Sequence, residues 1–174
     1  MTNRPIRRGT QFIDRVPPAP PAPPSTAPAP APSKKETDEK AREVVARMMS
    51  RDVFSQWLGV EVLEVADQQA VIRMTVRPEM MNGFGFAHGG IVFAFADSAH
   101  AFCSNSSGEI SVAVDCNISY PAPIRVGDVL TATAIELTST NRLAFSEITV
   151  RNQDDIVVAL FRGTVYRTRK PLPE

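Results

Sequence analysis

The sequence predicts an α+β domain in which a curved antiparallel sheet of about six strands wraps around one long apolar helix. Two alternating runs come first, a long apolar segment follows, and four further strand-like runs come after it. When strands outnumber helices so strongly, the sheet has to curl around the long helix to bury it. A length of 174 residues suits one such domain.

The first 36 residues are not expected to fold. Ten of the 15 prolines precede Ser33, and residues 17–32 are almost entirely proline and alanine. Such a tract buries too little apolar surface to offset chain entropy, so an extended, polyproline-II-rich tail is expected. The tail is either inert or a ligand for an aromatic-lined groove of a partner. The folded domain is expected to span residues 37–170, with a loose end after Arg169.

Order is expected to begin near Thr37 with a helix whose apolar residues recur at helical spacing, namely Ala41, Val44, Val45, Met48 and Met49. Asp52 is placed to cap a short turn, which Gly59 ends. Two runs with alternating apolar residues then predict a hairpin with one buried face. These residues are Val60, Val62 and Val65 in the first run, and Ala70, Ile72, Met74 and Val76 in the second.

The apolar segment after His88 predicts a buried helix, because its length and alanine content favour helix over strand. Gly89 and Gly90 lie where this helix begins. Glycine there allows a close approach to the backbone, and the first N–H groups of a helix have no intrahelical partner. They can bind an oxygen that becomes an anion. Asp97 interrupts the apolar run, and a carboxylate in such a setting is costly unless it is paired or used.

Four strands are expected after the helix, at residues 110–120, 128–138, 143–152 and 156–167. A connector that contains two prolines, residues 121–127, separates the first two. Each run is longer than the usual strand of about five or six residues. The sheet is therefore expected to be large enough to enclose the helix.

Composition excludes several classes of protein. Nineteen acidic and nineteen basic residues give no net charge, which argues against nucleic-acid or membrane-surface binding driven by charge. No apolar run reaches transmembrane length, and the N-terminus lacks the apolar core of a signal peptide. Cys103 and Cys116 are expected to be buried free thiols, and the two histidines form no familiar zinc-site spacing with them. A cytoplasmic protein is expected.

Several motifs occur in the order found in the hotdog-fold acyl-CoA thioesterases. They are Asn82-Gly83-Phe84, Ala87-His88-Gly89-Gly90, Asp97, Pro121 to Asp128 with its Gly127-Asp128 turn, Leu143-Ala144-Phe145 and residues 158–163. Through them, residues 40–168 resemble that superfamily, and most of all its PaaI-like, phenylacetyl-type branch. The resemblance implies a hotdog fold, dimers with a continuous sheet that often pair into tetramers, and hydrolysis of an acyl-CoA to acid and free thiol. It implies no metal and no cofactor, since CoA is part of the substrate.

The resemblance also implies catalytic roles. The N–H of Gly89 would bind the thioester oxygen, and Asp97 would attack the carbonyl or activate water. His88 would orient the turn or help to bind the thioester, and Asn82 would hold the turn or contact substrate. The competing interpretations are a purely structural Asp97 paired with His100 and a Gly89 that only starts the helix.

Further residues are expected to bind the substrate or its CoA moiety, namely Gly90, Arg142, Ser98, His100 and Phe84. Arg142 lies in a turn where relatives carry a basic residue near CoA phosphates. Ser98 and Asp115 are candidates for holding the attacking water, because Ala113 replaces the hydroxyl of some relatives. His100 departs from the branch and could line the acyl pocket or tune Asp97.

The spacing of Gly89 and Asp97 has a consequence of its own. Eight helical residues rise about 12 Å, so the two groups of one chain cannot act on one carbonyl. If both act, Gly89 of one subunit must meet Asp97 of another across a twofold axis. Together with the family resemblance, this spacing predicts a dimeric thioesterase, and the resemblance implies aryl-acetyl or medium-chain acyl-CoA as its substrate. The alternatives are a non-catalytic acyl-CoA-binding module whose proline-rich tail recruits a partner, and a hotdog hydratase that uses His100.

Overall fold

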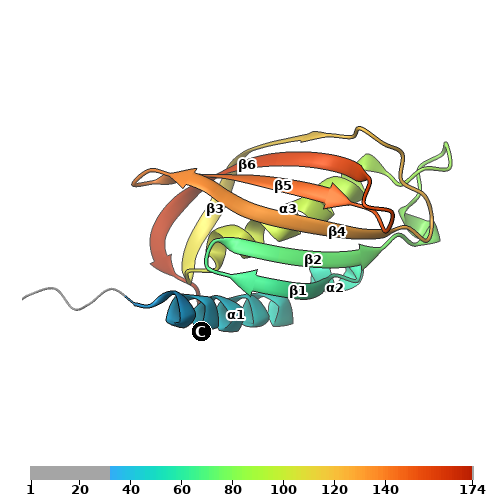
Figure 1. The fold of residues 1–174 in the computed structure, drawn as a ribbon. Helices are drawn as coiled ribbons and strands as arrows, with labels where there is room; N and C mark the ends of the chain where they lie inside the picture. The colour runs from blue at the N-terminus through green and yellow to red at the C-terminus, as the bar shows by residue number, and fades with distance from the viewer. Residues whose placement is uncertain (1–31, 174) are drawn as a thin grey trace, which may run out of the picture. The chain divides into compact units, whose positions relative to one another are not determined.

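The computed structural model describes residues 32–173, and most of the predicted tail, residues 1–31, lies outside the described residues (Figure 1). None of the helices within residues 32–173 is long and apolar enough to cross a membrane. In order, the elements are α1 (Lys34–Arg51), α2 (Val53–Leu58), β1 (Glu61–Ala66), β2 (Gln69–Thr75), the 3-10 turn η1 (Pro78–Met80), α3 (Gly89–Asn105), β3 (Glu109–Ser119), β4 (Val129–Ser139), β5 (Leu143–Arg151) and β6 (Val157–Pro171).

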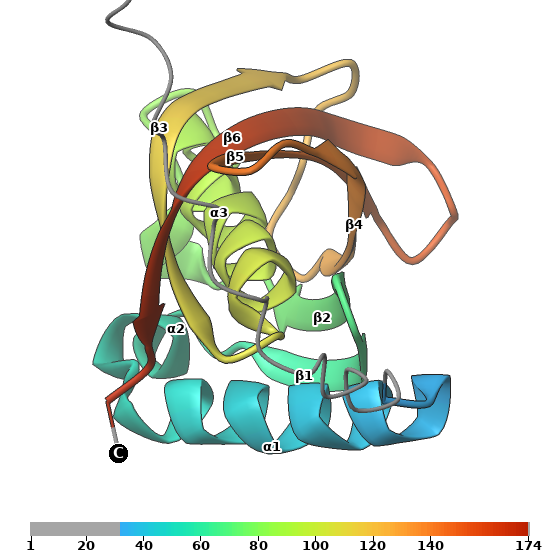
Figure 2. The same ribbon diagram turned by 90° about the vertical axis from the view of Figure 1, so that its left-hand side faces the viewer.

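The six strands form one antiparallel sheet in the order β1-β2-β4-β5-β6-β3. Figure 2 shows α3 inside the curve of this sheet and α1 against β1. The predicted fold class is therefore confirmed. The first strand after the helix, β3, lies at the far edge of the sheet beside β6, and its other edge is unpaired among the described residues.

The central helix α3 begins where the sequence predicts, with His88 as its N-cap. It is buried on most sides, and Phe95, Ala96, Ala99 and Phe102 are at most 1% exposed. They pack with residues of β2, β4, β5 and β6 into one core. Burying one phenylalanine of this kind contributes about 2–3 kcal/mol, so this helix anchors the domain and fixes the position of its own N-terminus.

The first helix starts three residues before the predicted Thr37, at Lys34. A capping box explains the difference. Ser33 Oγ accepts from the Glu36 N–H at 3.4 Å, while the Ser33 N–H donates to the Glu36 carboxylate at 2.7 Å. The two groups satisfy backbone donors that the helix itself leaves open.

Two further expectations need correction. Val62 is 37% exposed because a bulge between Val62 and Glu64 shifts the alternation of β1, so only part of the predicted face is buried. The end after Arg169 is not loose, since β6 continues to Pro171 and the Leu172 N–H donates to the carbonyl of Gly108 at 3.0 Å.

Candidate active site

A tight turn delivers the chain to the N-terminus of α3. The side-chain oxygen of Asn82 accepts from the N–H groups of Phe84 at 2.8 Å and Phe86 at 3.3 Å. This closes the glycine-containing turn and leaves Phe84 at its tip, 87% exposed. Of the two roles expected for Asn82, holding the turn is the one that these hydrogen bonds serve.

His88 caps the helix through its side chain. Its Nδ1 accepts from the Gly90 N–H at 2.9 Å, so the neutral imidazole carries its proton on Nε2. A Cβ at Gly90 would lie 3.1 Å from this Nδ1, so glycine leaves room for the cap. Within residues 32–173, the neighbouring N–H of Gly89 makes no hydrogen bond. The first turn of α3 therefore presents one free donor, at Gly89.

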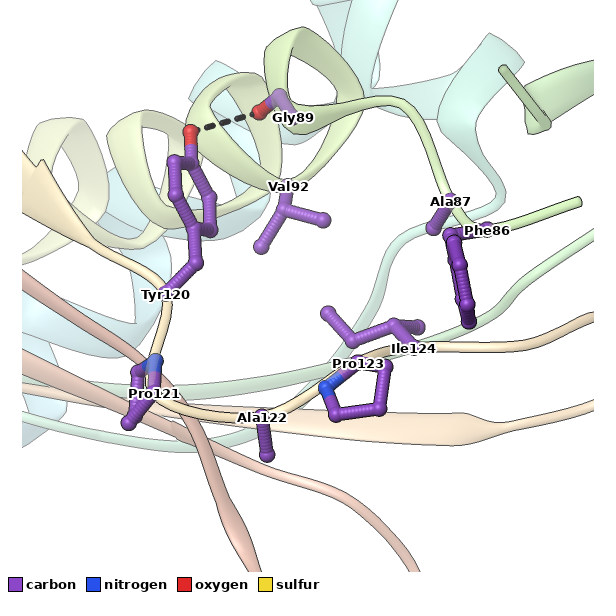
Figure 3. Close-up of a pocket in the computed structure, with 9 residues that line it drawn as sticks. All are labelled: Phe86, Ala87, Gly89, Val92, Tyr120, Pro121, Ala122, Pro123 and Ile124. Atoms are coloured by element: carbon purple, nitrogen blue, oxygen red, sulfur yellow. Dashed lines mark hydrogen bonds between the residues drawn. The ribbon is translucent and has the colours of Figure 1, made fainter. Parts of the chain in front are cut away.

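An apolar pocket of about 390 Å³ opens beside this donor (Figure 3). The loop of residues 120–124 faces Phe86, Ala87, Gly89 and Val92 across it. The Tyr120 hydroxyl donates to the carbonyl of Gly89 at 2.8 Å and so ties this loop to the first turn of α3. Burial raises the pKa of Tyr120, which keeps the hydroxyl protonated and donating.

Tyr120 was not singled out from the sequence, and the loop after it was noted as a connector and a family motif but not as part of the site. The signal that was present is an aromatic residue directly before the two prolines of a connector, Pro121 and Pro123. The role of this aromatic residue depends on which strand of the sheet ends beside the N-terminus of the helix. That strand is β3, the edge strand.

Asp97 lies outside this pocket. It stands eight residues, or about 12 Å, further along α3 than Gly89. Its side chain is 45% exposed, and its carboxylate lies 3.8 Å from Nδ1 of His100. Within one chain, the two groups expected to act on one carbonyl are therefore not brought together.

His100 is 1% exposed and packs against Phe161, with ring centroids 5.6 Å apart. It occupies the space above Gly163, where an added Cβ would lie 2.3 Å from Cε1 of the imidazole. Neither ring nitrogen makes a hydrogen bond within residues 32–173, and Nε2 is fully buried. The pairing with Asp97 is thus an approach of 3.8 Å, longer than a hydrogen bond.

Both cysteines are free thiols, as predicted, but only Cys103 is buried, and the expected burial of Cys116 is wrong because that residue is half-buried. Cys116 lies on β3 directly opposite Gly163, beside His100 and Asp97. Burial, and then the charges of Asp97 and Asp115, raise its pKa to about 11. Cys103 is in the core, where its Sγ donates to the carbonyl of Gln68 at 3.0 Å, and burial raises its pKa to about 12.

The remaining predicted residues lie away from the pocket. Ser98 is buried, and its hydroxyl bonds to that of Ser55 at 2.9 Å, which links α3 to α2. Arg142 is in the β4–β5 turn, where its guanidinium lies over the ring of Tyr166. This turn and the loop of residues 120–124 are at opposite ends of the sheet (Figure 1). Neither Ser98 nor Arg142 lines the pocket.

The family model described as "Thioesterase superfamily" matches residues 84–159. The acyl-coenzyme A thioesterase PaaI of Escherichia coli is 37% identical over 128 residues, which are 74% of this chain and 91% of that protein. The E. coli PaaI structure, described as from the phenylacetic acid degradation operon, has a TM-score of 0.77 and 34% identity, covering 79% of this chain and 99% of that one. A Streptococcus mutans protein bound to acetyl-CoA has a TM-score of 0.63 and 25% identity, covering 65% and 91%.

Proposed function

We propose that this chain, which belongs to the thioesterase superfamily and is an acyl-CoA thioesterase with the hotdog fold, hydrolyses aryl-acetyl or medium-chain acyl-CoA at a site shared by two subunits. The free N–H of Gly89, at a helix N-terminus that borders an apolar pocket, carries the proposal. In the reaction, a water molecule supplies its oxygen to the thioester carbonyl, either directly or after attack by Asp97, and the C–S bond breaks. The acid keeps the hydroxyl from water, and the CoA sulfur takes the other proton.

Gly89 supplies the oxyanion site. Its N–H points from the N-terminus of α3, where the helix dipole favours negative charge. As the carbonyl oxygen becomes negative in the transition state, this donor stabilises it by roughly 3–4 kcal/mol, as in comparable enzymes. Tyr120 holds the carbonyl of the same residue and so fixes the orientation of the first turn.

Asp97 of a second subunit supplies the base or the nucleophile. The separation along α3 prevents Asp97 from reaching a carbonyl bound at Gly89 of its own chain. The free edge of β3 offers a place for a second copy, because Val112 and Val114 are 52% and 58% exposed along it. A long apolar edge strand is seldom left uncovered. A twofold contact there is isologous, so each dimer would contain two equivalent sites.

The pocket supports an aryl-acetyl or medium acyl group. Its volume of about 390 Å³ and its lining of aromatic, aliphatic and proline side chains suit an apolar group of moderate size. The relatives named for PaaI and the acetyl-CoA complex support CoA as the thiol. Because Arg142 lies at the far end of the sheet, any contact that it makes with CoA phosphates would come from another subunit, as in a dimer of dimers.

Mixed dimers test the shared site. Asp97→Ala removes the base or nucleophile, and Gly89→Pro removes the N–H, so each variant alone should hydrolyse phenylacetyl-CoA at least about 100-fold more slowly. When the two are unfolded together and refolded, half of the dimers combine one chain of each kind. Each mixed dimer then contains one intact site, and activity should return to about a quarter of the wild-type value.

Two results would overturn the proposal. A site within one chain would stay inactive in every mixture, because no chain then carries both groups. A folded wild-type dimer that hydrolyses neither phenylacetyl-CoA, hydroxyphenylacetyl-CoA, benzoyl-CoA nor straight-chain acyl-CoAs would contradict the proposed substrate class.

A further inference from the structure

Three metal-ligating side chains meet beside the middle of α3, outside the pocket at Gly89. One ligand atom from each of Asp97, His100 and Cys116 lies within 4.8 Å of the other two. Asp97 and His100 come from α3, one turn apart, and Cys116 comes from β3. The fold makes this meeting possible through Gly163, because any side chain there would collide with the imidazole.

The imidazole of His100 is left without hydrogen bonds by the rest of the described chain. It is 1% exposed, its Nε2 is buried without a partner, and its Nδ1 lies 3.8 Å from Asp97. Polar atoms inside native proteins nearly always have a partner. An ion bound by Nδ1, the nitrogen that faces Asp97, would give that atom a partner and leave the proton of the ring on Nε2. The Cys116 thiol also makes no hydrogen bond within residues 32–173.

We propose that Asp97, His100 and Cys116 form a Zn²⁺ site, and that a bound ion inhibits the enzyme by occupying the carboxylate of Asp97. The inhibitory part rests on the proposed function of Asp97, whereas the binding part does not. One imidazole, one thiolate and one carboxylate form the mixed N, S and O set that Zn²⁺ accepts. Three protein ligands leave the fourth tetrahedral position for water.

The distance between His100 and Asp97 is close to that of such a site, and all three ligand atoms lie within 4.8 Å of one another. Ligand atoms about 2.0–2.3 Å from Zn²⁺ in a tetrahedron lie roughly 3.3–3.6 Å from one another. The observed 3.8 Å between His100 and Asp97 is slightly longer. The Asp97 side chain is 45% exposed, so a rotation of its carboxylate closes the gap without moving the core.

The charges also favour a cation. The Asp97 carboxylate lies within 4.8 Å of the Cys116 thiol, so negative charge already stands beside the proposed ion. Zn²⁺ would displace the proton of Cys116 to solvent and bind the resulting thiolate. The ion then compensates both the thiolate and the Asp97 carboxylate. An Asp97 carboxylate that shares its negative charge with Zn²⁺ is a weaker base and a weaker nucleophile.

Metal binding to the tag-free, full-length protein tests the site directly. Titration with Zn²⁺ should give one ion per chain, and Co²⁺ in its place should give a thiolate-to-metal charge-transfer absorption. Cys116→Ser should weaken Zn²⁺ binding at least about tenfold and abolish the Co²⁺ band. Cys103→Ser, at the other cysteine, is the matched control and should retain both.

A wild-type protein without a Co²⁺ thiolate band, or a band lost in Cys103→Ser and kept in Cys116→Ser, would refute the site. The wild-type Co²⁺ spectrum answers the question even if Cys116→Ser does not fold. Chromatography of the released acid measures the rate of hydrolysis. In the wild type, this rate should fall when Zn²⁺ is added and recover when EDTA is added. In Cys116→Ser, the response to Zn²⁺ should be at least about tenfold smaller. Unchanged wild-type hydrolysis with one Zn²⁺ bound would refute inhibition.

The two proposals fail separately. An enzyme inactive on every acyl-CoA that still gives the Co²⁺ thiolate band contradicts the proposed substrate class and keeps the metal site. An active enzyme that binds no metal keeps the proposed substrate class and contradicts the metal site.

Discussion

Replacing Gly89 with proline removes one hydrogen-bond donor with little cost to the fold. Gly89 is the first residue of α3, where the missing N–H of proline has no intrahelical role. His88 already has φ −63° and ψ 128°, the extended conformation that a residue before proline requires. The variant should therefore fold and dimerise like the wild type.

Its activity should fall steeply. Loss of an oxyanion donor costs roughly 3–4 kcal/mol of transition-state stabilisation, or about 100- to 1,000-fold in kcat. Gly89→Ala is the matched control, because it keeps the N–H, and its Cβ would meet the Tyr120 ring at an ordinary 3.4 Å. The kcat of Gly89→Ala should stay within about tenfold of the wild-type value.

The assay is steady-state hydrolysis of phenylacetyl-CoA by the wild type and both variants, with circular dichroism and size-exclusion chromatography as controls of folding and assembly. A folded Gly89→Pro dimer with wild-type kcat would refute the assignment of Gly89 as the oxyanion donor. Equal losses in both variants would show that space at Gly89, and not its N–H, is what matters.

Two other predictions concern the surroundings of His100. Gly163→Ala should lower the free energy of unfolding by about 1–3 kcal/mol, because the new Cβ would lie 2.3 Å from His100 Cε1. Urea denaturation measures this change, with Gly83→Ala as the control, since an added Cβ at Gly83 meets nothing within 4 Å. Equal stabilities of the two variants would contradict the prediction. Cys116 has a pKa of about 11 against the ordinary 9.0, so at pH 8 it should react with iodoacetamide roughly 100-fold more slowly than an exposed thiol. Its reaction rate should rise about tenfold with each pH unit until the pH reaches that pKa. Mass spectrometry of the labelled protein checks the rate, Cys103 should be slower still, and rapid labelling of Cys116 at pH 8 would be inconsistent with the raised pKa.

Elements that depend on neighbouring residues could be predicted from the sequence. His88, the two glycines and the apolar run identify the start of α3, because capping and helix propensity act within a few residues. Alternation located the four later strands to within about a residue at most ends. The start of α1 was missed although its signal is local, since Ser33 and Glu36 form a capping box at the usual spacing.

The candidate site was predicted only in part. Gly89, His88 and Asp97 come from one continuous stretch, and helical rise alone separates Gly89 from Asp97. Tyr120 and Cys116 come from the end and the middle of another segment, and their roles depend on where β3 lies in the sheet.

The sequence by itself determined the elements, the buried central helix and the donor at its N-terminus, because hydrogen bonding and periodicity within a segment are local. Only the tertiary structure decided which side chains meet. The strand after α3 pairs with β6 at the sheet edge, and this brings Tyr120 to Gly89 and Cys116 to His100. Ser98 faces α2 for the same reason, since the packing of α3 in the curved sheet selects the direction of each of its side chains. Contacts between distant segments follow from packing the whole chain, which no local pattern encodes.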